Sequence, residues 1–396
     1  MMKILILDDE TRRANEWKAS ISNFSKVEID VFAPEHVSEL ISKFHQARFD
    51  SRGGKYIPVT DYDQYDLVII DYDLLGLQMD RPAAWATGAE LAYCIRMMSL
   101  IGYVVVVNQF GTNSFDLTMC RGISSYADTD VGSSQIASKG LWSSSGFEGF
   151  RPWHWPDLLK ESARFPIVKG FVKEHLDDSV FESLGFDLSD SDLPNFVNYE
   201  VSSYIGAGQR NNVTFRDLIS SGTGRIFNAL EKDRPIFEVM PPDQLAAVCA
   251  SILIRWLEKV VLPSQEVVSD LPHLCIQMPW VVDEFNSMGR WASLCSFERE
   301  IVPQILEPYL FQHDFLFSRP VFWAERARRE ILVPDGFTFE ATPSIQFCED
   351  LSRFMPEGEC SSFPSDVLAF DKKRWICDQD AAAKNVNYEP QSYLLM

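Results

Sequence analysis

The sequence predicts an α/β fold for its N-terminal part, an open and doubly wound sheet with helices on both faces. Three apolar runs carry this prediction, at residues 4–7, 67–70 and 104–107. Their apolar residues are continuous rather than alternating, and this pattern is typical of parallel strands that helices cover on both sides. Segments with helical spacing of apolar residues lie between the runs, so strand and helix alternate along the chain.

Each element of this sheet can be placed in turn. Apolar side chains recur at the spacing of one helix face, as Trp17 and Ile21 do in the first helical segment. We expect helices at residues 11–24, 34–49, 88–98 and 157–165. We expect strands at residues 3–7, 27–32, 67–71, 103–107 and, as a short fifth strand, 136–138. Loop-like composition predicts insertions near residues 51–64 and 111–135.

The chain changes character after about residue 170. A polar, irregular stretch leads to the clearest helix of the sequence, at residues 243–262, which Pro263 ends. Further elements are expected as helices from about 217, near 296–310 and near 320–331, and as strand-like pieces at 331–333, 337–340 and 366–370. These patterns predict a mostly helical α+β output region over residues 171–378 and a poorly ordered tail at 379–396.

Composition narrows the class of partner. The 396 residues include 57 acidic and 36 basic side chains, and the resulting net charge of −21 repels the backbones of DNA and RNA. The eight cysteines form no C-x-x-C pair, so buried thiols in a reducing cytoplasm are the natural interpretation. A strand from residue 3 leaves no room for a signal peptide, and the apolar stretch 245–262 contains three charged residues. We therefore expect a cytoplasmic protein that binds neither nucleic acid nor membrane.

Polar side chains end three of the predicted strands. Asp8 and Asp9 follow the first strand, Asp71 ends the third and Asn108 follows the fourth. In an open α/β sheet the functional crevice lies outside the carboxyl ends of the strands, so these side chains are expected to meet there. Clustered carboxylates repel each other unless a cation offsets their charge, and Mg²⁺ prefers such oxygen ligands. The sequence therefore predicts a magnesium site at this edge of the sheet.

A lysine completes this group of side chains. Lysine is absent from residues 56–138, and Lys139 ends that gap. One carboxylate of such a group can accept a phosphoryl group, and a lysine can then pair with the new charge. The simpler alternative is that acidic residues follow strands into solvent-exposed loops. Two acidic strand ends together with a single later lysine favour a site over this alternative.

Four segments resemble a known family. They are ILILDDE at residues 4–10, YDLVIIDYDLLG at 65–76, TGAELAYCIR at 87–96 and VVVVN at 104–108. Together and in this order they resemble the receiver domain of two-component response regulators, over residues 1 to about 165. The resemblance implies a five-stranded, parallel, flavodoxin-like sheet. It also implies phosphorylation by a histidine kinase or a phosphotransfer protein.

The resemblance assigns a role to each polar residue of the site. Asp71 would be the phosphoacceptor, and Asp8 and Asp9 would be the metal-binding pair. The backbone carbonyl of Asp73 would be a further ligand of Mg²⁺. Lys139 would pair with the phosphoryl oxygens.

Two residues depart from the family pattern. Asn108 stands where the family usually has a serine or threonine, whose hydroxyl moves toward the phosphoryl group and triggers the switch. Gly140 follows Lys139, where the family usually has proline. The insertions also stretch the domain beyond the compact family form. The departures at Asn108 and Gly140 favour a phosphate sink or a pseudo-receiver scaffold, whereas the intact Asp8, Asp9 and Asp71 favour a regulator or a sink.

Two classes of function therefore stay open. The first is a signalling receiver that autophosphorylates from a phosphohistidine. Its output region, which has no recognisable active site and does not bind DNA, acts on an effector protein or is itself an enzyme. The alternative is a phosphate sink or buffer, or a pseudo-receiver scaffold, that binds partner proteins in a multi-component phosphorelay such as one of phage defence. A homodimer is compatible with either class.

Three local patterns elsewhere are weaker. Residues 222–224 (Gly-Thr-Gly) suggest a phosphate loop, but a break in a helix explains them better. His313 and Asp314 suggest a metal-dependent hydrolase dyad, but a surface loop is the better interpretation. His273 with Cys275 suggests half of a metal or thiol site, against which a packed loop is favoured.

Overall fold

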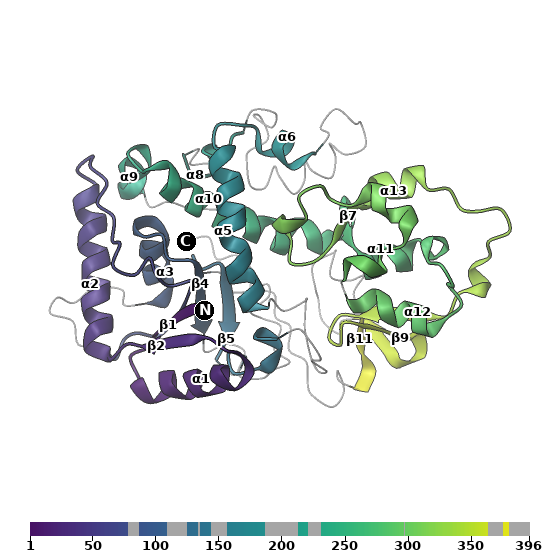
Figure 1. Ribbon diagram of the computed structural model, residues 1–396, viewed down its shortest axis with the longest axis horizontal. Helices are drawn as coiled ribbons and strands as arrows, with labels where there is room; N and C mark the ends of the chain where they lie inside the picture. The colour runs from purple at the N-terminus through teal and green to yellow at the C-terminus, as the bar shows by residue number, and fades with distance from the viewer. Residues whose placement is uncertain are drawn as a thin grey trace.

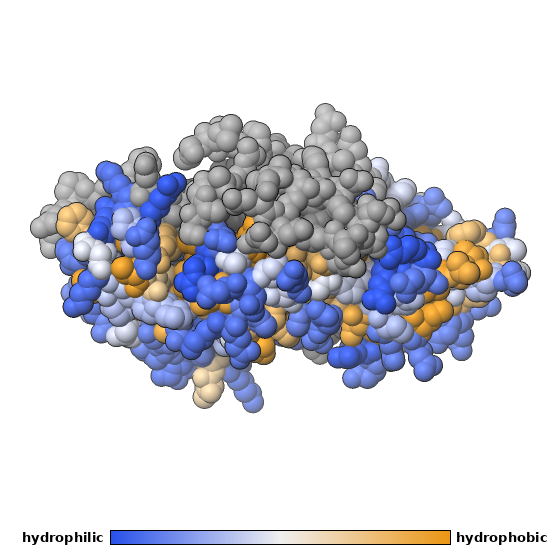
Figure 2. All heavy atoms as spheres, turned by 90° about the horizontal axis from the view of Figure 1, so that it is seen from above, coloured by the Kyte–Doolittle hydropathy of each residue, from blue (hydrophilic) through white to orange (hydrophobic). Residues whose placement is uncertain are grey.

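The computed structural model of this chain describes most of the sequence. Its described residues are 1–77, 87–108, 125–133, 135–143, 157–186, 213–220, 231–296, 298–362 and 375–379. Figure 1 shows the purple and blue sheet and its helices beside a green and yellow part formed by later residues. On the face that Figure 2 displays, hydrophilic residues cover much of the described surface, with smaller groups of hydrophobic residues between them.

A five-stranded, all-parallel sheet forms the centre of the N-terminal part. Its strands are β1 (Lys3–Leu7), β2 (Glu28–Val31), β3 (Leu67–Asp71), β4 (Tyr103–Asn108) and β5 (Thr129–Gly132). Their order across the sheet is β2-β1-β3-β4-β5. The helices between them are α1 (Thr11–Phe24), α2 (Pro34–Ser51) and α3 (Gly88–Met98). Figure 1 shows α1 on the side of the sheet away from α3, which confirms the predicted doubly wound α/β architecture.

The register of the strands places the polar strand ends together. Leu7 of β1 lies opposite Ile70 of β3, so Asp8 and Asp71 follow at the same edge. Asp71 in turn lies opposite Val107 of β4, which Asn108 follows. Parallel strands present their carboxyl ends at one edge of a sheet, and the change in strand order between β1 and β3 opens a crevice there.

The fifth strand differs from its predicted position. β5 is Thr129–Gly132, whereas residues 135–137 form a turn, so the prediction of a strand at 136–138 was wrong. β5 contains a single large apolar residue, Val131, which pairs with Val107 of β4. Such a short strand leaves no apolar run for a sequence pattern to detect. Ile136 is buried because it fills the core beside the sheet, and its carbonyl accepts a hydrogen bond from Trp142 Nε1 at 2.7 Å.

The helix predicted at 157–165 is longer in the structure. α5 spans Leu158–Glu174, so the segment 165–171, where a domain boundary was expected, lies inside a helix. The predicted helix at 243–262 is present as α10 (Pro242–Trp256), followed by one π-helical turn, η4 (Leu257–Val261), and a 3₁₀ turn, η5 (Leu262–Ser264). One hydrophobic core extends from Ile4 to Val321 and so includes both parts of the chain. The division into two domains stays a prediction.

Buried hydrogen bonds reinforce the contact between α10 and the sheet. Gln244 Nε2 donates to the carbonyl oxygens of Arg96 at 2.8 Å and Ser99 at 2.7 Å. Ser251 Oγ donates to the Asp128 carboxylate, which also accepts from Arg96. All five residues are buried, so these hydrogen bonds offset the cost of removing the bonded atoms from water.

A second, smaller core lies in the C-terminal part. It includes residues of α11 (Leu271–Gln277), α12 (Met288–Ser293) and α13 (Ala324–Glu330), together with Phe322 of β7 (Val321–Trp323). β7 pairs with β6 (Val268–Asp270) in a two-stranded sheet, whose Val268 and Val321 belong to the first core. A four-stranded sheet in the order β10-β11-β8-β9 is formed by β8 (Ile345–Cys348), β9 (Arg353–Pro356), β10 (Cys360–Ser362) and β11 (Trp375–Cys377). The remaining short elements are η1 (Lys139–Leu141), α6 (Val180–Leu184), α8 (Asp217–Ser220), η3 (Glu231–Asp233), α9 (Arg234–Glu238), η6 (Pro279–Val281), η7 (Leu294–Ser296), η10 (Asp314–Leu316), η11 (Phe339–Ala341) and η12 (Glu357–Glu359).

Several expectations for this part were wrong. The helix near 296–310 is replaced by two 3₁₀ turns, η8 (Arg299–Ile301) and η9 (Gln304–Tyr309), because two prolines interrupt the segment. Residues 331–333 and 337–340 form no strand, since a turn between them closes with the Phe337 N–H donating to the Pro334 carbonyl. The predictions at 366–370 and 380–396 lie outside the described residues. Among the helices that the structure describes, none has the length and apolarity needed to cross a membrane.

Candidate metal centre

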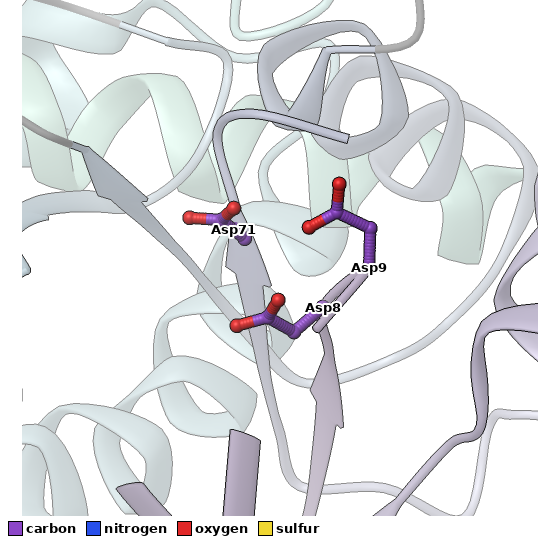
Figure 3. A group of neighbouring side chains, drawn as sticks. All are labelled: Asp8, Asp9 and Asp71. Atoms are coloured by element: carbon purple, nitrogen blue, oxygen red, sulfur yellow. The ribbon is translucent and has the colours of Figure 1, made fainter. Parts of the chain in front are cut away.

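Three carboxylates meet at the carboxyl edge of the central sheet. One oxygen from each of Asp8, Asp9 and Asp71 lies within 4.8 Å of the other two. Figure 3 shows these side chains around one space, with Asp8 and Asp9 just beyond β1 and Asp71 at the end of β3. Asp8 and Asp71 are buried and Asp9 is partly exposed, so the group opens to solvent on the side of Asp9. Among the described residues this is the one group of three or more His, Cys, Asp or Glu side chains whose ligand atoms lie close enough together to hold a metal ion.

The turn after β3 fixes the orientation of Asp9. The backbone N–H of Gly76 donates a hydrogen bond to Asp9 Oδ2 at 2.8 Å. A Cβ atom at Gly76 would lie 2.4 Å from that oxygen, so this close approach requires a glycine. The same turn is closed by the Leu75 N–H, which donates to Asp73 Oδ1 at 3.1 Å.

The start of α3 is packed directly against Asp71. The N–H of Gly88 donates to the carbonyl of Tyr72 at 2.8 Å. A Cβ atom at Gly88 would lie 2.2 Å from the carbonyl oxygen of Asp71, so only a glycine allows this helix to begin here. Thr87 caps the helix, because its side chain accepts from the Glu90 N–H at 3.3 Å. The backbone of Asp71 is therefore held from two sides, by β4 and by α3.

Arg13 of α1 reaches into the carboxylate group, and the sequence patterns missed it. Its Nε donates to Asp8 Oδ2 at 2.8 Å, and its Nη2 donates to Asp8 Oδ1 at 2.9 Å. Nη2 also contacts Asp71 Oδ2 at 2.5 Å and Asp9 Oδ1 at 3.3 Å. A helical side chain points back toward the N-terminus of its helix, and Arg13 lies four residues after Asp9. That spacing was the signal in the sequence.

Burial and mutual repulsion shape the protonation of the group. Burial, followed by the charge of Asp8, raises the pKa of Asp71 to about 7, although the Arg13 guanidinium opposes this shift. Burial also raises the pKa of Asp9 from its ordinary value, against a hydrogen bond from Gly76 that lowers it. The hydrogen bond to Asp8 raises the pKa of Arg13, which stays charged. One guanidinium therefore does not balance three carboxylates.

This arrangement fits a hard divalent cation. Its three ligand groups are carboxylates, and oxygen ligands of this kind suit Mg²⁺, Ca²⁺ or Mn²⁺. Burial and the neighbouring carboxylates of Asp8, Asp9 and Asp73 raise the pKa of Asp71, and a bound cation would oppose this shift by favouring the ionised form. Such an ion would be held by Asp8, Asp9 and Asp71.

The other predicted site residues come from the end of β4, the turn after β3 and the start of η1. Asn108 is buried at the end of β4, and its carbonyl accepts from the Ser133 N–H at 2.8 Å. Asp73 is partly exposed and forms an isolated bridge with Thr87. Lys139 is exposed at the start of η1 and forms no ion pair within the part of the chain that the structure describes. Its predicted role with the phosphoryl oxygens stays a prediction.

The weaker candidates have packing partners. His273 lies between Asp270, at 2.6 Å from its Nδ1, and Glu349, at 2.7 Å from its Nε2. His313 packs beside the ring of Phe171, and its Nε2 lies 3.0 Å from the carbonyl of Ser183. Residues 222–224 lie outside the described residues.

Comparison of the chain with models of protein families, with curated proteins and with solved structures found no match to any of them. The site must therefore be interpreted from its own geometry.

Proposed function

We propose that this protein is a receiver of two-component signalling, whose Asp71 accepts a phosphoryl group from a histidine kinase or a phosphotransfer protein. The observation that carries the proposal is the meeting of Asp8, Asp9 and Asp71 at the switch point of a β2-β1-β3-β4-β5 sheet. Mg²⁺ is the proposed cofactor, held by these carboxylates and by the backbone carbonyl of Asp73. A cytoplasmic location and partners that are proteins rather than nucleic acids belong to the same proposal.

The chain's own residues account for the transfer. An Asp71 carboxylate oxygen attacks the phosphorus of a phosphohistidine, the new O–P bond forms, and the P–N bond breaks as the imidazole recovers its electron pair and then a proton. Magnesium, when bound, neutralises charge on the transferred group. Asp8 and Asp9, which follow β1, would hold that cation beside Asp71. Lys139 is proposed to pair with the phosphoryl oxygens after transfer.

Asp71 must be ionised before it can attack the phosphorus. A carboxylate with a pKa of about 7 is partly protonated near neutral pH, and the protonated form is a poor nucleophile. A bound cation favours the ionised form. Transfer to Asp71 is therefore expected to need the metal for ionisation of the nucleophile as well as for charge on the phosphoryl group.

Incubation with acetyl phosphate and Mg²⁺, followed by intact mass, tests the proposal. We expect the wild-type protein to gain the mass of one phosphoryl group and Asp71→Asn to gain none. Asp61→Asn is the matched control, because Asp61 is an exposed carboxylate that pairs with Lys43. A wild-type protein that gains no mass, or a gain that persists in Asp71→Asn, would contradict the proposal.

A second function is favoured by one observation. Asn108 is buried where the family has a small hydroxyl that moves on phosphorylation. A longer side chain packed at this position restricts that movement, which suits a phosphate sink or a pseudo-receiver scaffold better than a relay. The amount of conformational change on phosphorylation separates the two functions.

A further inference from the structure

One nitrogen of Arg13 occupies the centre of the carboxylate group. Nη2 lies 2.9 Å from Asp8 Oδ1, 3.3 Å from Asp9 Oδ1 and 2.5 Å from Asp71 Oδ2. It therefore contacts one oxygen of each of the three carboxylates. A divalent cation bound by the same carboxylates would stand about 2.0–2.6 Å from its oxygen ligands. The cation and this nitrogen would be in steric and electrostatic conflict.

We propose that Arg13 is a built-in counter-cation that competes with the divalent metal, so that metal loading requires its guanidinium to leave Asp71. This inference deepens the proposed function and rests on it for its biological meaning. In this inference Arg13 helps to set the metal concentration at which the site becomes occupied. The metal-free protein is stabilised by the guanidinium among its carboxylates, and the metal-bound protein places the guanidinium elsewhere.

Arg13 has room to move. Its side chain is 30% exposed, whereas the side chains of Asp8 and Asp71 are 0% and 6% exposed. Its guanidinium carbon lies 5.8 Å from the centre of the Trp17 ring, one helical turn further along α1. An outward rotation about the side-chain torsions keeps the guanidinium beside this aromatic ring, where a cation is favoured. The carboxylates are held by the sheet and by Gly76, so Arg13 is the movable partner.

Charge explains why a divalent metal ion would replace the Arg13 guanidinium among the carboxylates. With Arg13 in place, three carboxylates share the single positive charge of its guanidinium among the residues that the structure describes. A divalent ion supplies twice that charge at shorter distance, so it displaces the guanidinium once its concentration is sufficient. Removal of Arg13 leaves the metal without a competitor but leaves the metal-free site with uncompensated repulsion. The inference therefore predicts opposite effects on metal affinity and on metal-free stability.

Binding of Mn²⁺, measured from the electron paramagnetic resonance signal of the free ion, with Mg²⁺ as competitor, tests the inference without any phosphoryl donor. We expect Arg13→Gln to bind either metal about tenfold more tightly than wild type. Its melting temperature in EDTA should fall and should recover fully on addition of Mg²⁺. Arg13→Lys keeps the charge but lacks the planar fork that reaches three carboxylates. Its metal affinity should therefore lie between those of the wild type and Arg13→Gln.

Arg12→Gln is the matched control. Arg12 precedes Arg13 on the same helix, is 85% exposed and pairs only weakly with Glu16 at 3.8 Å. Its substitution should leave metal affinity unchanged. Equal or weaker metal binding by Arg13→Gln would overturn the inference, and so would an absence of binding in every variant. If Arg13→Gln does not fold, a metal affinity of Arg13→Lys equal to that of wild type would overturn it.

The two proposals fail separately. A wild-type protein that binds metal in competition with Arg13 but gains no phosphoryl group from acetyl phosphate would refute the receiver function and support the competition. A protein that is phosphorylated on Asp71 while Arg13→Gln has the affinity of wild type would refute only the competition.

Discussion

Arg48 of α2 binds the fully buried carboxylate of Asp233, with Nε at 3.0 Å and Nη2 at 2.8 Å from Asp233 Oδ2. The two residues are 185 positions apart in the chain. Arg52 Nε at 2.8 Å and the Tyr93 hydroxyl at 3.1 Å complete the surroundings of the carboxylate. This group joins the N-terminal sheet part to the helical segment that begins at residue 231. The region predicted as an output unit is therefore fastened to the receiver-like part by buried charge as well as by a shared core.

Substitution of Asp233 by alanine is expected to destabilise the protein by about 3–5 kcal/mol, because it leaves buried arginine charge without a partner. Denaturant unfolding of the full chain measures this difference. Asp243→Ala is the control, since Asp243 pairs with Lys173 at an exposed position and such pairs contribute roughly 0–1 kcal/mol. Equal effects of the two substitutions would show that the Asp233 group does not hold the parts together.

Gly88→Ala should destabilise the protein by about 1–3 kcal/mol, because its new Cβ would meet the carbonyl oxygen of Asp71 at 2.2 Å. The backbone of Asp71 must then shift, so metal affinity should fall as well. Gly170→Ala is the contrasting control. Gly170 lies inside α5, and a Cβ atom added there would meet no heavy atom within 4 Å, so alanine should stabilise the helix by roughly 0.5–1 kcal/mol. A Gly88→Ala protein with wild-type stability and metal affinity would contradict the assigned contact.

The carboxylates around His273 lead us to expect a loss of stability at alkaline pH. Burial alone would lower the pKa of its imidazole, but the carboxylates of Asp270 and Glu349 outweigh burial and raise this pKa to about 9. The folded protein thus binds this proton more tightly than the unfolded chain does. The resulting stabilisation is fully present below pH 6.5 and is lost as pH rises through about 9.

The expected loss is about 3 kcal/mol of unfolding free energy between these two pH values, from the linkage between pKa and stability. Unfolding measured across this range should show the loss in wild type and a flatter profile in His273→Gln. His175→Gln should follow the wild type, because His175 pairs with Asp178 at an exposed position. A His273→Gln profile as steep as that of wild type would mean that other groups cause the dependence.

The sequence predicted the central sheet and the three carboxylates well, and physical reasons explain what it missed. Continuous apolar runs identify buried parallel strands, but β5 has only Val131 as a large apolar residue and derives its strand geometry from pairing with β4. The sequence patterns did not identify Arg13, since a periodic pattern shows which face of a helix is buried and not which side chain returns to the preceding strand end. Arg48 and Arg96 were not identified for the same reason, although both are buried against acidic partners.

The final prediction concerns whether phosphorylation is transmitted. Asn108 is 2% exposed at the end of β4, and its carbonyl is bonded to the Ser133 N–H in the segment after β5. If the proposed receiver function is right, a buried amide at this position leaves little space for the inward movement that a hydroxyl makes in receiver domains. We expect hydrogen exchange of residues 125–143 to change little between the metal-bound protein and its beryllofluoride complex, which mimics phosphorylated Asp71.

Asn108→Thr should enlarge that change, because a shorter side chain with a hydroxyl restores both the space and the donor. Asn15→Thr, at an exposed position on α1, is the control for a threonine introduced elsewhere. A large change in the wild type that reaches α5 and α10 would favour a working relay over a phosphate sink, because α5 connects the sheet to α10 through the shared core. A small change in both wild type and Asn108→Thr would mean that the switch is prevented elsewhere, with the exposed Lys139 as the next residue to substitute.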